Sequence, residues 1–447
     1  MKEYLPYYRK LTLLGLPIII GQLGQIVLGF ADTLMIGHHS TEELAAAAFV
    51  NTMYTLVLIT ALGFSYGLTP VVGTLNGQGQ TKKIGCVLKN AWLANGLVSL
   101  GMMAVMGVFY LNIGHMGQPE ELLPLMRPYF LLQLVSLPFV LLFNAMKQFF
   151  DGIMSTQVSM WVMLVGNVAN IVGNWLLIYG VGGLPEMGLM GAGVATLLSR
   201  AMMTLLLVAI FFRRPRYRDY CTGFAEGHIN RSDFVQLNRL GFPLALQMGM
   251  ETASFSLTSI MVGWLGTSAL AAHQVLLTIS QLFYMVYYGM AAAVSVMVSH
   301  YLGQRDYHAL LRTSQAGFHI IIFIAFCVAV PVFLFRWQLG ELFTDSTEVS
   351  ALVAACIIPM MFYQFGDGLQ CNYANVLRGI SHVRPMVTIA FVAYVVVSLP
   401  MAYVLAFMLD GGLVGIWWSF LFGLTTAGLL YYLAFRRQYG RISTNKV

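Results

Sequence analysis

Residues 11–37 read LTLLGLPIIIGQLGQIVLGFADTLMIG, and this mostly apolar stretch decides the class of fold. The run from Leu11 to Ile36 exceeds the roughly twenty residues that a helix needs to cross a bilayer. It is too long for the roughly 7–15-residue core of a signal peptide, and no obvious small-residue cleavage site follows it. We therefore interpret it as a retained membrane span.

The whole chain shares this apolar character. Of its 447 residues, 58% are hydrophobic and only 9% are charged, whereas an ordinary soluble domain has about 25% charged residues. Lipid satisfies no backbone hydrogen bonds, so membrane-spanning elements must be helices or a closed barrel. Barrel strands alternate apolar and polar residues over roughly ten positions, but the apolar runs here exceed about twenty. The composition therefore predicts an all-α membrane protein.

Turn residues and charge clusters divide the chain into twelve predicted spans. The predicted spans are Leu11–Ile36, Leu44–Leu75, Ile84–Ile113, Leu122–Phe149, Gln157–Tyr179, Met187–Phe212, Phe234–Trp264, Ala269–Tyr301, Leu310–Phe335, Val349–Leu377, Met386–Met408 and Leu413–Phe435. A polar stretch, residues 213–233, separates the first six from the last six. We expect two six-helix lobes, residues 1–212 and 234–447, joined by this linker.

The basic residues indicate the orientation of the chain in the membrane. Of the 24 Lys and Arg residues, only Arg127 and Arg336 fall in loops on one side, and Arg200 lies inside a span. Cytoplasmic loops carry excess Lys and Arg, so both termini and the linker are predicted to be cytoplasmic, in a multi-pass protein of the cell inner (plasma) membrane. The net charge of +6 is then a topology signal, and we expect no nucleic-acid partner.

An internal repeat relates the two halves. Shifting the chain by 226 residues places Leu14, Gly15 and Pro17 on Leu240, Gly241 and Pro243, and the register holds through Gly77 and Gln78 on Gly303 and Gln304. Six spans separate the copies, so both halves share one orientation and are related by an axis along the membrane normal. A duplication can simply build a larger bundle. Two like-oriented halves that enclose a cleft favour a secondary transporter instead.

Three carboxylates lie inside predicted spans: Asp32, Glu251 and Asp367. An intramembrane carboxylate costs about 3 kcal/mol on insertion scales, so each needs water, a cation or a proton. Arg200 is the one basic residue deep in a span and can pair with one of them at most. A bound cation or proton is the simplest partner, and water-solvated structural acids are the alternative.

The repeat shows that the acids are not duplicated packing elements. Its offset places Asp32 on Thr258 and Glu251 on Gln25. Tyr363 precedes Asp367 by one helical turn, so its hydroxyl can complete an oxygen site, although an interior tyrosine often only packs. Two histidines near span ends, at 273 and 300, can shuttle protons, but we favour simple solvation for both.

Several motifs resemble those of the multidrug and toxic compound extrusion (MATE) family, and within it the NorM-type branch. The resemblance covers nearly the whole chain. The motifs are GFADTLMIG (29–37), LNGQGQ (75–80), LGFPLALQMGMETASF (240–255), LAAHQV (270–275), YQFGDGLQ (363–370) and LRG (377–379). The resemblance implies an antiporter, coupled to sodium or protons, that exports amphipathic and often cationic drugs and toxic compounds.

The resemblance also implies roles for residues that match these motifs. Glu251, Tyr363 and Asp367 look like a second-lobe cation site, which would hold the metal if the coupling ion is sodium. The first-lobe site that the resemblance implies consists of Asp32, Asn170, Asn174 and Thr196. Many family members have Asp where this chain has Asn174. Asn170, Asn174 and Thr196 can instead simply form hydrogen bonds between helices, without binding a cation.

Other functional classes lack their motifs. The string GQGQTKK (77–83) does not have the spacing of a nucleotide-binding loop, so we expect no ATPase subunit. No nucleophile elbow or HExxH motif is present, and an enzyme is not expected. The five cysteines have no metal-type spacing and are interpreted as reduced packing residues. A flippase for lipids or lipid-linked oligosaccharides is the remaining alternative, and it would need a basic cleft. We expect a monomer in the lipid bilayer, small organic cations and a monovalent coupling cation as ligands, and no cofactor.

Overall fold

A computed structural model describes residues 2–344 and 346–444. Within these residues the chain is helical and contains no strand, which confirms the all-α prediction. Contacts divide it into two compact units. We call residues 20–245 the N-unit, and residues 2–19 together with 246–444 the C-unit. The lobe limits expected from the order of the spans stay a prediction, because the helices that contain residues 19–20 and 245–246 contribute to both units.

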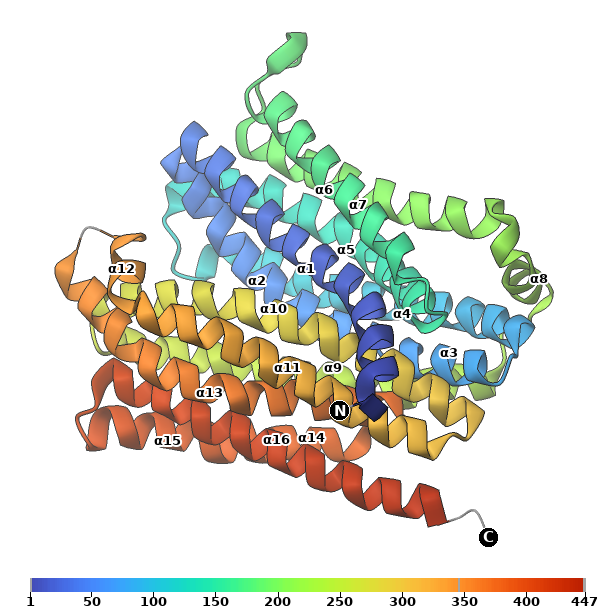
Figure 1. Cartoon of the computed structure of the whole chain (residues 1–447). Coiled ribbons are helices and arrows are strands. Elements are labelled where there is room, and N and C mark those ends of the chain that lie inside the picture. The colour runs from blue at the N-terminus through green and yellow to red at the C-terminus, as the bar shows by residue number, and fades with distance from the viewer. Residues whose placement is uncertain (1, 345, 445–447) are drawn as a thin grey trace. The chain divides into compact units, whose positions relative to one another are not determined.

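The N-unit is a helical bundle in which α6 packs on α7, and α5 packs on both α4 and α7 (Figure 1). Its core contains Tyr54, Met126, Phe130 and Leu137, all nearly inaccessible to solvent. The helices of this unit are α1 (Leu5–His39, from residue 20), α2 (Thr41–Ser65), α3 (Leu68–Gly77), α4 (Thr81–Asn112), η2 (Ile113–His115), η3 (Glu120–Leu122), α5 (Leu123–Gly152), α6 (Thr156–Ile178), η4 (Val181–Gly183), α7 (Gly188–Arg213), η5 (Pro215–Tyr217), α8 (Arg218–Glu226) and α9 (Arg231–Gly263, to residue 245).

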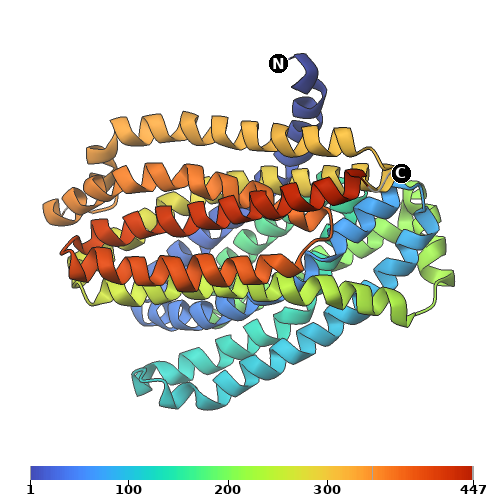
Figure 2. The ribbon, with the colours of Figure 1, turned by 90° about the horizontal axis from the view of Figure 1, so that it is seen from below.

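The C-unit is built around α13, which packs against both α10 and α16. The orange and red helices of this unit run side by side in Figures 1 and 2. Its helices are η1 (Lys2–Tyr4), the start of α1, the end of α9, α10 (Thr267–Gln304), α11 (Tyr307–Leu334), α12 (Arg336–Glu341), α13 (Thr347–Gly379), α14 (Arg384–Ala390), η6 (Phe391–Ser398), α15 (Leu399–Tyr403), η7 (Val404–Met408) and α16 (Gly412–Thr444).

Eleven helical segments in the described part of the chain are long and apolar enough to cross a membrane. They correspond to eleven of the twelve predicted spans. The remaining predicted span, Phe234–Trp264, lies in α9, which is long enough but interrupted by polar residues such as Gln247 and Glu251. An interior polar face is what a functional helix of a membrane bundle is expected to carry.

The predicted span Met386–Met408 is not one regular α-helix. It contains α14, η6, α15 and η7, of which η6 and η7 have the wider π-helical turn. Pro400 lies in α15 between them and cannot donate a backbone hydrogen bond. Such π segments occur often at functional sites, and η6 carries Tyr394.

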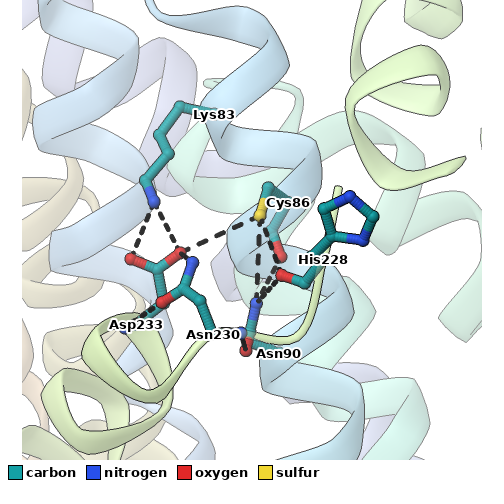
Figure 3. A network of polar contacts seen from close by, with 6 residues as sticks. All are labelled: Lys83, Cys86, Asn90, His228, Asn230 and Asp233. Atoms are coloured by element: carbon teal, nitrogen blue, oxygen red, sulfur yellow. Dashed lines mark hydrogen bonds and ion pairs between the residues drawn. The ribbon is translucent and has the colours of Figure 1, made fainter. Parts of the chain in front are cut away.

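The predicted linker is partly helical and is held against α4. Lys83 of α4 pairs with Asp233, with 2.6 Å between Nζ and Oδ2 (Figure 3). Asn230 Nδ2 donates to Asp233 Oδ2 at 2.7 Å, and its Oδ1 accepts from the backbone N–H of Asp233 at 2.7 Å. Lys89 Nζ donates to the carbonyl oxygen of Gly227 at 2.8 Å. The linker therefore belongs structurally to the N-unit.

The five cysteines are free; Cys356 and Cys371 are buried, whereas Cys327 is exposed.

Candidate cation sites

The C-unit brings together Glu251 from α9 with Asp367 and Tyr363 from α13. Glu251 Oε2 accepts a hydrogen bond from Gln247 Nε2, one turn earlier in α9, at 2.9 Å. The Tyr394 hydroxyl, brought by η6, also bonds to Glu251. Gln370 Nε2 of α13 donates to the same hydroxyl at 2.9 Å. Glu251 is thus tied to a helical neighbour and, through Tyr394, to α13.

Asp367 is the least satisfied member of this group. It is 4% exposed, and no described side chain donates a hydrogen bond to its carboxylate within the usual distance. The charge of Asp367 acts on Glu251, and the charge of Arg378, further along α13, acts on Glu251 in the opposite sense. Neither carboxylate makes an ion pair with a described basic residue within 4.0 Å. A buried carboxylate, Asp367, and a half-buried one, Glu251, are costly without an ion-paired base, and a bound cation removes this cost.

Tyr363 is positioned by two other helices. Its hydroxyl is hydrogen-bonded to Ser280 Oγ of α10. Its ring lies 5.8 Å from that of Trp417 and 6.3 Å from that of Phe420, both in α16. One helical turn separates Tyr363 from Asp367 on α13, so the hydroxyl and the carboxylate lie on the same side of that helix. The site therefore has both charged and neutral oxygens.

Sequence reasoning missed several polar residues of the C-unit site. Gln364, beside Tyr363 in α13, is 3% exposed, and neither its amide oxygen nor its amide nitrogen has a hydrogen-bond partner among the described residues. Tyr284 of α10 lies within electrostatic reach of both Glu251 and Asp367. Helical spacing could have predicted the contact of Gln247 with Glu251, because the two residues are four positions apart in one helix. Ser280, Tyr284 and Tyr394 were not predictable, since their approach depends on packing between helices.

The N-unit brings together the other four predicted residues. Asn174 Nδ2 of α6 donates to Asp32 Oδ1 of α1 at 2.5 Å and to Asn170 Oδ1 at 3.0 Å. Asn170 Nδ2 in turn donates to Thr196 Oγ1 at 3.2 Å and to Ser199 Oγ at 3.1 Å, both in α7. A single network of hydrogen bonds therefore joins α1, α6 and α7. Ser199 is the member that the sequence did not reveal.

Arg200 follows Ser199 and reaches the same interior. Its Nη1 donates to Gln133 Oε1 at 2.7 Å, to Ser136 Oγ at 2.5 Å and to the Tyr54 hydroxyl at 2.9 Å. The guanidinium carbon lies 4.9 Å from the centre of the Tyr54 ring. Its charge acts on Asp32. Arg200 was expected to pair with at most one intramembrane acid. That acid is Asp32, on which the charge of Arg200 acts without a direct ion pair between the two side chains.

The fit of these sites to a metal ion can be judged from their donor atoms. No group of three or more His, Cys, Asp and Glu side chains that could hold a metal ion occurs in the described residues. The C-unit site instead offers carboxylate, hydroxyl and amide oxygens, which suit a hard cation such as sodium.

His273 differs from the expectation of a solvated histidine. It is 1% exposed, and its Nε2 is hydrogen-bonded to Ser259 Oγ at 3.1 Å. Its ring centre lies 5.6 Å from that of Trp417. The prediction was wrong because the apolar pattern near the start of α10 does not show that this face packs against α9 and α16.

Comparison with known proteins identifies the family. The family model MatE matches residues 17–176 and 243–404, one match in each half. The chain is 31% identical over 435 residues to the multidrug resistance protein NorM of Aliivibrio fischeri, covering 96% of this chain and 94% of that protein.

Solved structures show the same fold. A multidrug resistance MATE transporter of the MOP superfamily, in an outward-facing conformation, is 19% identical, with a TM-score of 0.90 and coverage of 98% of this chain and 97% of that one. A mutant of the MATE transporter VcmN of Vibrio cholerae is 18% identical, with a TM-score of 0.88 and 98% of both chains covered. The matches in both halves and the similarity to NorM along nearly the full length agree with the motifs noted above, and the chain belongs to the MATE family of membrane transporters.

Proposed function

We propose that this protein is a cation-coupled antiporter of the inner (plasma) membrane that exports amphipathic, often cationic compounds. Glu251, Asp367 and Tyr363 hold the coupling cation, which is sodium or a proton. The observation that carries this proposal is the buried Asp367 carboxylate beside the half-buried Glu251 carboxylate on which its charge acts, with no described basic residue ion-paired to either within 4.0 Å. The similarity to a multidrug resistance protein supports the choice of cargo.

The coupling follows from the cost of leaving the two carboxylates unneutralised. A cation that binds more tightly in one conformation than in another shifts the balance between them by its difference in binding free energy. Two neighbouring like charges, of which Asp367 is buried and Glu251 half-buried, make this difference large, because binding relieves both the repulsion and the loss of hydration. The membrane potential adds about 2.3 kcal/mol per charge per 100 mV.

Cargo recognition follows from the same chemistry. Acidic side chains set in spans rich in Met, Phe and Tyr favour cations with apolar or aromatic bodies through charge and cation–π contacts. A proton or sodium ion on a carboxylate weakens that attraction, so the coupling ion and the cargo compete. Neither an ATPase partner nor a cofactor is required, and one copy of the chain has both candidate sites.

Transport by purified protein in liposomes tests the proposal. Efflux of a fluorescent organic cation is measured with a sodium gradient alone, a proton gradient alone and neither. Wild-type protein is expected to respond to one gradient, while Glu251→Gln and Asp367→Asn abolish the response and remain folded. The matched control is Glu348→Gln, which removes a charge from the exposed start of α13 and is expected to transport normally. Normal cation-driven efflux by both site variants would refute the assignment.

A further inference from the structure

The turn between α7 and α8 (Figure 1) carries four arginines, which we call the arginine turn: Arg213, Arg214, Arg216 and Arg218. All four residues are exposed. None of their guanidinium groups makes an ion pair or a hydrogen bond with a residue that the structure describes. Asp219 is the one acid among residues 213–219, so four positive charges against one negative charge leave this segment with a net charge of +3.

Aromatic packing holds the arginine turn in place. Phe211, two residues before the first arginine, is buried, and its ring lies 5.3 Å from that of Phe149 of α5. Its carbonyl oxygen also accepts a hydrogen bond from Cys221 Sγ at 3.0 Å. Tyr217, between the last two arginines, is buried, and its ring lies 5.3 Å from that of Phe150. These contacts order the backbone that presents the arginines, so less conformational entropy is lost when the arginines bind a ligand.

The arginine turn lies at the end of a segment that can cross a membrane. The apolar segment formed by α7 ends at Arg213. Phe212, the residue before it, is 49% exposed, and an exposed aromatic side chain at the end of a span suits contact with lipid. An apolar side chain followed directly by cations matches the change from acyl chains to headgroups at the surface of a bilayer. This end of α7 is on the side of the membrane that the basic residues predict to be cytoplasmic.

Phosphate is the chemical group that the arginine turn fits. A guanidinium group is planar, always charged and able to bind phosphate through two parallel hydrogen bonds. Each basic residue beside a membrane span strengthens the attraction to anionic lipid by about fivefold. We propose that the arginine turn binds the phosphate groups of anionic phospholipids in the cytoplasmic leaflet and thereby fixes the end of α7 at the membrane surface. This surface is separate from both candidate cation sites, and the inference does not depend on the proposed transport.

Equilibrium binding of radioactive short-chain phosphatidylglycerol to the purified full-length protein in neutral detergent tests the proposal. The site variant combines Arg213→Gln, Arg214→Gln, Arg216→Gln and Arg218→Gln. Its affinity for phosphatidylglycerol is expected to be at least about tenfold lower than that of the wild type. The replaced side chains are exposed and have no partner among the described residues, so the variant is expected to keep the wild-type Tm when no phosphatidylglycerol is present. An unchanged affinity would overturn the proposal.

The matched control removes the same charge from the C-unit. It replaces by glutamine four other exposed arginines, which lie in α14 and α16: Arg384, Arg436, Arg437 and Arg441. Its affinity for phosphatidylglycerol is expected to fall by less than about threefold, because only screened long-range attraction is lost. Equal losses of affinity in the site variant and the control would mean a general attraction between a cationic protein and an anionic lipid, and the proposal would be rejected.

Competition separates a lipid from a free phosphate ion. Inorganic phosphate at millimolar concentration and constant ionic strength is expected to displace little of the bound phosphatidylglycerol. Phosphatidylcholine, whose choline group cancels the charge of its phosphate, is expected to bind at least about tenfold more weakly. Displacement by inorganic phosphate, or equal binding of the two lipids, would contradict a site for anionic lipid.

Two smaller variants keep the test decisive if the fourfold variant does not fold. Arg213→Gln with Arg214→Gln, and Arg216→Gln with Arg218→Gln, each remove half of the positive charge of the arginine turn. Each double variant is expected to weaken the binding of phosphatidylglycerol by about threefold or more. If both double variants fold and bind this lipid as tightly as the wild type does, the arginine turn is not its binding site.

Discussion

The contact between α4 and the linker helix α8 predicts the effect of one added methyl group. A Cβ atom on Gly85 of α4 would lie 2.0 Å from the carbonyl oxygen of Tyr220 and 2.6 Å from the backbone nitrogen of Phe224. In the same contact, a Cβ on Gly223 would lie 2.0 Å from the carbonyl oxygen of Lys82. Real Cβ contacts do not fall below 3.0 Å. The obstacles are backbone atoms, so no side chain can turn aside and the two helices must separate.

The magnitude follows from that separation. Gly85→Ala forces α8 away from α4 by about 1 Å or more, and overpacking of this kind typically costs about 1–3 kcal/mol. Since each 1.4 kcal/mol is a factor of ten in an equilibrium constant, the undocked form of α8 should rise about five- to hundredfold. Gly96→Ala, on the same helix, is the matched control because a Cβ there meets nothing within 4 Å.

The thiol of Cys221 in α8 reports the docking. Its Sγ is hydrogen-bonded to the carbonyl oxygen of Phe211 at 3.0 Å, and burial raises its pKa above the ordinary value for a thiol. Undocking removes that burial, so the pKa falls, the thiolate fraction at a given pH rises and alkylation becomes faster. The assay is the alkylation rate at constant pH in a variant that keeps Cys221 as its sole cysteine. Equal rates for wild type, Gly85→Ala and Gly96→Ala would refute this account of the contact.

Three further predictions concern the linker and the cargo. A cysteine at Thr222 of α8 is expected to react with a membrane-impermeant maleimide only after cells are opened, and labelling of intact cells would contradict the cytoplasmic orientation. Lys83→Met should lower the free energy of unfolding by about 1–3 kcal/mol, because it leaves the buried Asp233 without its cation. The control is Lys82→Met, because the 4.0 Å ion pair between Lys82 and Glu226 is exposed; this variant should change the free energy of unfolding by less than about 0.5 kcal/mol. Equal melting temperatures for the Lys83→Met and Lys82→Met variants would contradict this prediction. Binding of an ethidium-like dye should weaken as the coupling cation is raised at constant ionic strength, and dye affinity independent of both pH and sodium would indicate coupling without shared charge.

The fold was largely predictable because membrane insertion imposes simple rules. Length and hydropathy located the spans, since a helix must cover a fixed thickness of lipid. The interruptions were not predictable. The predicted span 44–75 is divided into α2 and α3 near residue 66, and the predicted span 386–408 contains two π segments. Such breaks depend on neighbouring helices that satisfy the displaced backbone groups, which hydropathy does not record.

From composition and spacing alone, the candidate sites were predictable mainly in their charged members, whereas Asn170, Asn174 and Thr196 came from the family resemblance. Carboxylates inside apolar runs stand out, so Asp32, Glu251 and Asp367 were recognised from the residues alone. Their neutral partners are ordinary in type, and nothing in its spacing shows that Tyr394 reaches Glu251 from a π segment. Arg200 is the instructive case. Its position within a span was visible, but its three neutral acceptors come from helices far away in the sequence.

The repeat explains which features the two units share and which they do not. The boundary between the units falls after residue 19 and after residue 245. The 226-residue offset of the repeat aligns these two positions with each other. Each lies two residues after an equivalent proline, Pro17 in the first copy and Pro243 in the second. Both copies of the repeat therefore have a proline next to the boundary between the units. The acidic residues are not common to both copies. The position equivalent to Asp32 is Thr258, whose hydroxyl donates to the Ser254 carbonyl oxygen at 2.9 Å. The position equivalent to Glu251 is Gln25, whose Nε2 donates to Asn167 Oδ1 at 3.1 Å. Each unit thus keeps a satisfied neutral group where the other has an acid. The duplication therefore preserved the helical scaffold while the acidic positions diverged between the two units.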